Sequence, residues 1–184
     1  MQMQMLKNIV GLLLVTSAFV SYAGTYQDAV TEWKSHDEVA DWLENNFSFD
    51  KSRQKEIGKR LRSEGPSGLL VRSPEKLYEN SRGYCADSAN FVIHTLNTIN
   101  PSYNAKWVFI KNDAGRPNHW VTAFEYENKI YVMDYGTGTK WQAMQGVHGP
   151  YDSLDEYREF LASLDMPRFE VGEVYYREMP GKED

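Results

Sequence analysis

Three residues of the types that cooperate in thiol enzymes occur in this 184-residue chain in the order Cys85, His119 and Asp134. Cys85 is the only cysteine, so it cannot form an internal disulfide. It is either an inert buried thiol or a thiol kept for its chemistry. A thiol attacks a carbonyl carbon as the thiolate, which the start of a helix or a neighbouring imidazolium stabilises. Gly83-Tyr84-Cys85 opens a predicted helix, and this setting favours the reactive thiol.

The spacing of His119 and Asp134 predicts that these two side chains meet. Residues 119–126 and 129–135 are rich in β-branched and aromatic residues and predict two strands joined by a tight turn at Glu127 and Asn128. In such a hairpin His119 lies nearly opposite residue 135 or 136, within one residue of Asp134. A carboxylate there binds one ring nitrogen and leaves the other for a thiol. The alternative is that Asp134 only caps a turn.

The elements that must position these residues change in character along the chain. Capping patterns and helical spacing of apolar residues predict helices over 35–46, 50–63 and 73–80, and a further helix from residue 84 or 85 to about 100. After Pro101 the sequence predicts strands over 106–110, 119–126, 129–135 and 169–177, with a helix over about 153–161. Helices followed by a meandering sheet indicate an α+β fold in which the nucleophile's helix packs against an antiparallel sheet.

One predicted helix carries a run of basic side chains. Over residues 50–63 only Ile57 and Leu61 form an apolar stripe. The basic residues are Lys51, Arg53, Lys55, Lys59, Arg60 and Arg62. We interpret this run as a solvated face, and the alternative is a docking surface for an anionic polymer or a membrane.

The first 23 residues are typical of a secretory signal peptide. Lys7 precedes an apolar run over 9–20, and Ser21-Tyr22-Ala23 predicts cleavage after Ala23. The run is short for a bilayer span, so no stable membrane insertion is expected after cleavage; the alternative is an uncleaved anchor. Residues 24–184 then form a single domain in the periplasm or outside the cell. Its net charge of about −7 argues against a general nucleic-acid binder.

The three candidate catalytic residues and their order resemble those of the transglutaminase-like superfamily of papain-like cysteine enzymes. With its signal-like start, the chain resembles an exported bacterial member of that superfamily. The resemblance covers roughly residues 73–138 and rests on Gly83-Tyr84-Cys85 at a helix start, His119-Trp120 at the head of a strand and Asp134 at the end of the next. That pattern is a Gly-x-Cys helix, then a His strand, then an Asp strand.

By that resemblance Cys85 is the nucleophile, His119 the general base and acid, and Asp134 the residue that orients His119. Such enzymes attack a glutamine side-chain amide or a peptide bond, form a thioester and pass the acyl group to an amine or to water, without a metal or organic cofactor. Three features depart from the pattern, and one is that the calcium-binding apparatus of the animal enzymes has no counterpart in a chain this short. The negative charge of Asp87 close to the thiol opposes thiolate formation, and Asn80 is the only side chain that we can suggest as an oxyanion donor.

Three functions compete. The first is an exported cysteine hydrolase that acts on a peptide or protein substrate, in line with a cell-envelope location. The second is a protein-glutamine acyltransferase, in which Trp107, Trp120 and Trp141 shield the acyl-enzyme from water, although tryptophans more often fill a core. The third is a catalytically inactive binding domain of the same fold. A metal site made by Cys85, His119 and His148 is disfavoured, because no two of these residues have close ligand spacing.

Overall fold

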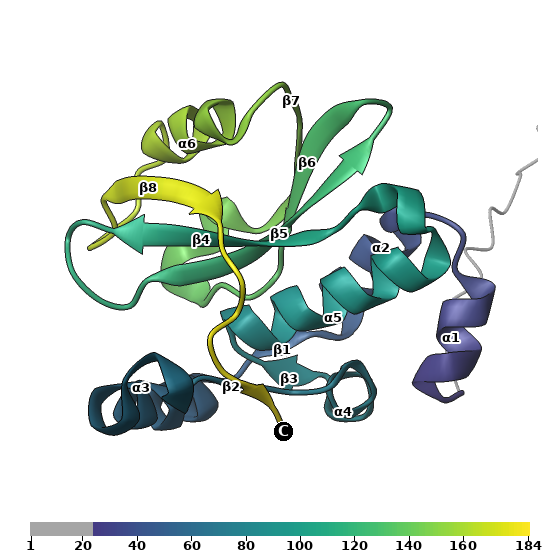
Figure 1. The fold of residues 1–184 in the computed structure, drawn as a ribbon, viewed down its shortest axis with the longest axis horizontal. Helices are drawn as coiled ribbons and strands as arrows, with labels where there is room; N and C mark the ends of the chain where they lie inside the picture. The colour runs from purple at the N-terminus through teal and green to yellow at the C-terminus, as the bar shows by residue number, and fades with distance from the viewer. Residues whose placement is uncertain (1–23) are drawn as a thin grey trace, which may run out of the picture.

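The computed structural model describes residues 24–184, and helices and strands follow one another in an α+β arrangement (Figure 1). The helices are α1 (Tyr26–Glu32), α2 (His36–Asn46), α3 (Lys51–Glu64), α4 (Pro74–Asn80), α5 (Cys85–Ile99) and α6 (Leu154–Ala162). The longer strands are β4 (Lys106–Asn112), β5 (His119–Tyr126), β6 (Lys129–Asp134), β7 (Gly146–Tyr151) and β8 (Val171–Tyr176). The two-residue strands are β1 (Ser48–Phe49), β2 (Leu70–Val71), β3 (Arg82–Gly83) and β9 (Lys182–Glu183).

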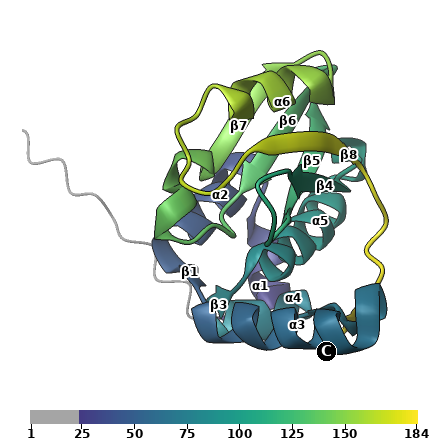
Figure 2. The same ribbon diagram turned by 90° about the vertical axis from the view of Figure 1, so that its left-hand side faces the viewer.

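The five longer strands form one antiparallel sheet in the order β7-β6-β5-β4-β8. One face of this sheet packs on α5, with the other N-terminal helices beyond it, and α6 covers the opposite face (Figures 1 and 2). Residues of β5 divide between the two faces with the period of two that a strand imposes. Phe124 lies in the core on the α5 side, whereas Val121 and Ala123 lie in the core under α6.

Helix α5 is the central element of the molecule. Every residue from Cys85 to Ile93 is buried, because α5 contacts the sheet on one side and α1, α2 and α4 on others. The hydroxyl of Thr122 on β5 donates a hydrogen bond of 2.9 Å to the carbonyl of Ala89. This bond and the apolar packing fix the position of α5 relative to the strand that carries His119.

Most predicted elements agree with the structure, and the α+β class is confirmed. Several strands were not predicted from the sequence, among them β7 and β9. Residues 146–151 form the edge strand β7. Residues Lys182–Glu183 form β9, which pairs with β2. Two glycines and a proline in β7 hid its strand character, and pairing with a distant strand cannot be read from local sequence.

The predicted signal peptide lies outside the described residues. Within residues 24–184, no helix combines the length and the apolar character that a bilayer span needs.

Candidate active site

Cys85 is the first residue of α5, and a hydrogen-bonded cap fixes the start of that helix. Asp87, in the first turn, accepts a hydrogen bond of 3.0 Å from the backbone N–H of Tyr84 at the N-cap position. The hydroxyl of Tyr84 donates to the carbonyl of Leu70 at 2.6 Å. The thiol thus lies beside the free N–H groups and the positive end of the helix dipole, which both favour an anion.

The charge of Asp87 is compensated, contrary to the effect expected from the sequence. Arg53 of α3 donates to both carboxylate oxygens, from Nε at 2.7 Å and from Nη2 at 3.0 Å, and the backbone N–H of Arg72 donates at 2.7 Å. Burial lowers the pKa of Arg53, but hydrogen bonds and charge from Asp87 and Asp184 outweigh burial and raise that pKa overall. Asp87 therefore caps α5, and the positive charge of Arg53 balances its negative charge close to the thiol.

His119 and Asp134 meet through the hairpin predicted from the sequence. Thr122 pairs with Met133 across β5 and β6, which is the predicted register. Nε2 of His119 lies 2.6 Å from Oδ2 of Asp134, and both residues are 2% exposed. The other carboxylate oxygen of Asp134 accepts the backbone N–H of Gly136 at 3.0 Å. Because the carboxylate occupies Nε2, Nδ1 of the ring remains for another partner.

The segment after β6 brings Cys85 to this pair. Gly136 lies directly against the start of α5, so close that a Cβ added at Gly136 would stand 2.3 Å from Cα of Cys85. Cys85 also lies near enough to the imidazole of His119 to help raise its pKa. The structure thus brings together the three residues that the sequence singled out.

The protonation of His119 reflects these neighbours. Burial lowers the pKa of His119, but the charge and hydrogen bond of Asp134, helped by Cys85, outweigh burial and raise this pKa from 6.5 to about 10. The imidazole is therefore protonated at neutral pH. An imidazolium beside a cysteine favours the thiolate form and holds a proton ready for a leaving group.

A groove of about 510 Å³ opens at Cys85, and we call it the thiol groove. Helix α3 forms one wall, and Phe109 and Trp120 of the sheet, with Asn118, form the other. Figure 2 looks toward the start of α5, with α3 below it and the sheet above. The lining combines apolar and polar side chains, which suits a ligand that has both an aliphatic or aromatic part and polar groups.

The other residues suggested from the sequence lie as follows. Among Trp107, Trp120 and Trp141, Trp120 lines the thiol groove. Trp107 packs edge-on against Trp120 at 5.7 Å between ring centroids, and Trp141 packs edge-on against His119 at 6.2 Å. Asn80 is exposed and donates to the carbonyl of Lys76, so its suggestion as an oxyanion donor was wrong.

Sequence reasoning missed Asn118 and Arg177 as residues of the thiol groove. Asn118 directly precedes His119, and that adjacency was the available signal. Within residues 24–184, no group of three or more His, Cys, Asp and Glu side chains is arranged to hold a metal ion.

A family model described as a transglutaminase-like domain matches residues 24–139. A solved structure titled "Crystal structure of a TGase" is similar over 66% of this chain, with 12% sequence identity and a TM-score of 0.38, and this chain spans 33% of that chain's length. No curated protein matches the sequence.

Proposed function

The chain belongs to the transglutaminase-like domain family, and we propose that it is a thiol enzyme that cleaves an amide or peptide bond. Cys85 is the nucleophile, and His119 is the general base and acid. Asp134 orients the ring of His119 and stabilises its protonated form. The observation that carries this proposal is the buried hydrogen bond of 2.6 Å between His119 and Asp134, beside the cysteine that starts α5. The fold alone does not carry it, because one fold supports many functions.

The reaction begins with attack on the substrate carbonyl. The sulfur of Cys85 forms a C–S bond, and the carbonyl oxygen becomes an oxyanion that the backbone N–H of Cys85, in the first turn of α5, stabilises. The imidazolium of His119 then gives its proton to the amide nitrogen, the C–N bond breaks, and an amine leaves a thioester on Cys85.

Water completes the cycle. Neutral His119 takes a proton from water, hydroxide attacks the thioester, and the carboxylic acid leaves as the C–S bond breaks. The sulfur departs as thiolate beside the reprotonated imidazolium, so the starting ion pair is restored. Through both halves the carboxylate of Asp134 keeps the ring in one orientation and stabilises its charged form.

We favour hydrolysis over acyl transfer to an amine because of the residues around the groove. Of the three tryptophans that an aromatic tunnel needs, only Trp120 lines the groove. The groove lining also includes Gln54 and Asn118, polar side chains beside which water can reach the acyl-enzyme. An acyltransferase remains the alternative, and the two differ in how the thioester is resolved.

The test uses p-nitrophenyl acetate, a small ester that requires no knowledge of the natural substrate. We expect a burst of one p-nitrophenol per protein and a mass increase of one acetyl group on Cys85, both absent in Cys85→Ala. A deacylation rate that is insensitive to added glycine ethyl ester supports a hydrolase, whereas a rate that rises with the amine indicates an acyltransferase. If the folded protein gives no burst, the proposed enzymatic activity is refuted, and a catalytically inactive binding domain becomes the favoured function.

We also propose that the enzyme is exported and acts on a peptide or protein of the cell envelope. The support is the signal-like sequence of residues 1–23. Mass spectrometry of the protein recovered from the periplasm should give a chain that begins at Gly24. Recovery of an intact chain from the cytoplasm alone would refute the proposed export.

A further inference from the structure

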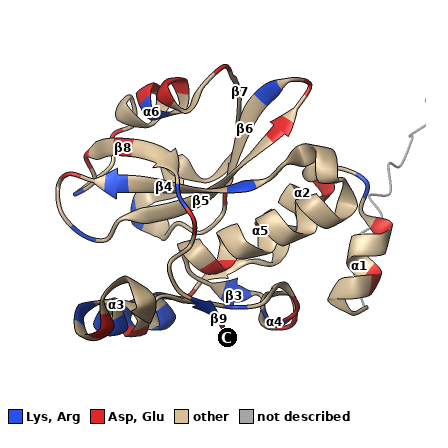
Figure 3. Cartoon of the chain, viewed as in Figure 1, with Lys and Arg blue, Asp and Glu red and all other residues tan. Residues whose placement is uncertain are grey.

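The thiol groove is lined by cations and by no acidic side chain. Lys55 and Arg62 come from α3, Arg116 from the loop before β5, and Arg177 from the segment after β8. Asp and Glu are absent from its lining. This is unexpected in a chain with net charge −6, in which 26 acidic residues outnumber 20 Lys and Arg. Part of the basic run of α3, which is blue in Figure 3 and which we interpreted as a solvated face, therefore lines the groove.

None of these four cations takes part in an ion pair with a residue of the described chain, 24–184. Glu178 follows Arg177 directly but does not line the groove. Four uncompensated charges in one concave site create a positive potential that attracts an anion.

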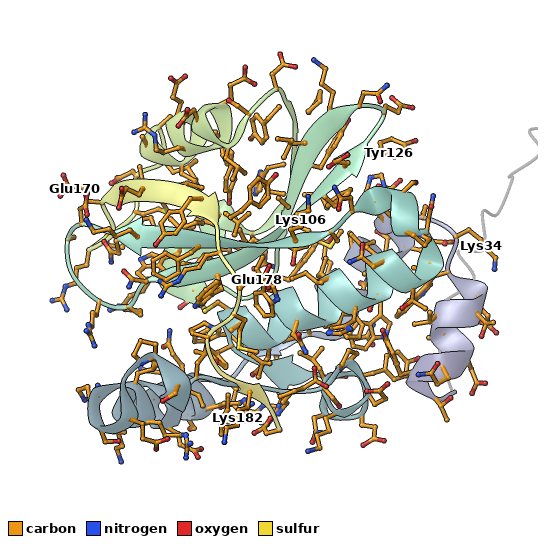
Figure 4. All side chains as sticks on the ribbon, in the orientation of Figure 1. Lys34, Lys106, Tyr126, Glu170, Glu178 and Lys182 are labelled. Atoms are coloured by element: carbon orange, nitrogen blue, oxygen red, sulfur yellow. The ribbon has the colours of Figure 1, made fainter. Side chains whose placement is uncertain are left out.

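Arg177 is the best positioned of the four. Its guanidinium lies over the ring of Phe109 at 4.8 Å and over that of Trp120 at 5.8 Å from the centroids. Its backbone N–H donates to the carbonyl of Trp107 at 3.2 Å, which holds the segment against β4. Stacking orients a planar guanidinium and leaves its edge donors for a carboxylate. Glu178 and Lys182 mark the path of this segment from the sheet toward β2 (Figure 4).

We propose that the thiol groove binds a peptide segment carrying Asp or Glu beside the scissile amide, with Arg177 as the principal carboxylate-binding residue. This inference rests on the proposed function, because it names the substrate class of the same site. Apolar groove residues Ile57, Leu61 and Leu69 contact the aliphatic parts of the segment, and the cations contact its carboxylates.

A peptide fits these observations better than other polyanions. The groove is lined in part by a thiol whose proposed chemistry is directed at an amide carbonyl, which nucleic acids and phosphate head groups lack. The cations lie around a concave site of about 510 Å³, so a flat membrane surface cannot meet all of them. The overall negative charge of the chain also opposes general binding to nucleic acid.

The first experiment compares alkylation of Cys85 by iodoacetate, which is an anion, and by iodoacetamide, its neutral analogue. At low ionic strength Arg177→Gln should lower the iodoacetate-to-iodoacetamide rate ratio about threefold, as should Arg116→Gln on its exposed loop. These differences should shrink in high salt. The control is Lys129→Gln, which removes the same charge at the start of β6, opposite Tyr126 and roughly 23 Å from His119.

The two proposals fail separately in this experiment. If neither reagent labels Cys85 in the folded protein at neutral pH, the proposed enzyme is refuted. Suppose instead that both reagents label Cys85, but Arg177→Gln and Arg116→Gln give the same iodoacetate-to-iodoacetamide rate ratio as Lys129→Gln. The groove cations then do not attract anions to Cys85, and the proposed acidic substrate is refuted.

The second experiment measures binding to Cys85→Ala, which requires no catalysis. A fluorescent octapeptide with two Glu residues should bind at least fivefold more tightly than the same peptide with Gln at those positions. Arg177→Gln should abolish this preference. Equal binding of the two peptides, or tighter binding of a single-stranded oligonucleotide or of phosphatidylglycerol vesicles that also depends on Arg177, would overturn the assignment of an acidic peptide.

Discussion

Replacing Gly136 with alanine should separate Cys85 from His119 without substituting either residue. A Cβ at Gly136 would stand 2.3 Å from Cα of Cys85, 3.0 Å from its backbone nitrogen and 3.1 Å from its Cβ. Ordinary carbon–carbon contact needs about 3.5 Å, so the start of α5 and the segment after β6 must move apart by about 1 Å. Because all three clashing atoms belong to the backbone or to Cβ, no rotamer change relieves the contact.

Two effects follow from that displacement. Overpacking of this kind costs about 1–3 kcal/mol of unfolding free energy, which denaturant titration measures. The second effect is on reactivity. At pH 6 an ordinary thiol is thiolate to only about 0.3%, so a cysteine that loses its imidazolium neighbour should react with iodoacetamide at least about tenfold more slowly.

Gly138→Ala provides the matched control. A Cβ there would meet only the ring of Phe49, at 3.2 Å, and that ring can shift by a few tenths of an ångström. We expect Gly138→Ala to keep the alkylation rate at pH 6. If Gly136→Ala matches wild type in both stability and alkylation rate, the segment after β6 does not lie as close to α5 as described. Our account of how the site is assembled is then wrong.

Three further changes test other contacts. Arg53→Met leaves the carboxylate of Asp87 buried without its charged partner and should cost about 3 kcal/mol in denaturant unfolding; an unchanged variant would show that the pair is unimportant. Because the folded pKa of His119, about 10, exceeds 6.5, its pair with Asp134 contributes fully below about pH 6.5 and is lost as pH rises through about 10. Unfolding free energy should therefore fall more between pH 6.5 and 10 in wild type than in Asp134→Asn, and parallel curves would contradict the assigned shift. Tyr84→Phe removes a hydrogen bond to a backbone carbonyl and should cost about 1 kcal/mol by thermal unfolding, with no change meaning that this contact does not stabilise the start of α5.

Local signals were enough to predict the His119–Asp134 half of the site. The strand pattern, the tight turn and the hairpin register depend on neighbouring residues, and together they determine which side chains face each other. Likewise, the predicted start of α5 follows from the residues around Tyr84. The α+β class follows from the order of these elements.

Other features depend on contacts between distant segments and could not be predicted. The compensation of Asp87 by Arg53 joins residues 34 positions apart, and nothing near Asp87 in the sequence reveals its partner. The same holds for Arg177, whose position over Phe109 and Trp120 depends on the segment between β8 and β9. The basic run of α3 was interpreted from composition, which cannot tell a solvated face from the wall of a groove.

The central claim is that Cys85 and His119 work as an ion pair, and the pH dependence of Cys85 alkylation by iodoacetamide tests it most directly. Protein with and without His119→Ala should be compared from pH 5 to 10. We predict fast labelling of wild type that persists below pH 7 and disappears in His119→Ala. Labelling that rises only above about pH 8 in both proteins, as for an ordinary thiol, would contradict the account.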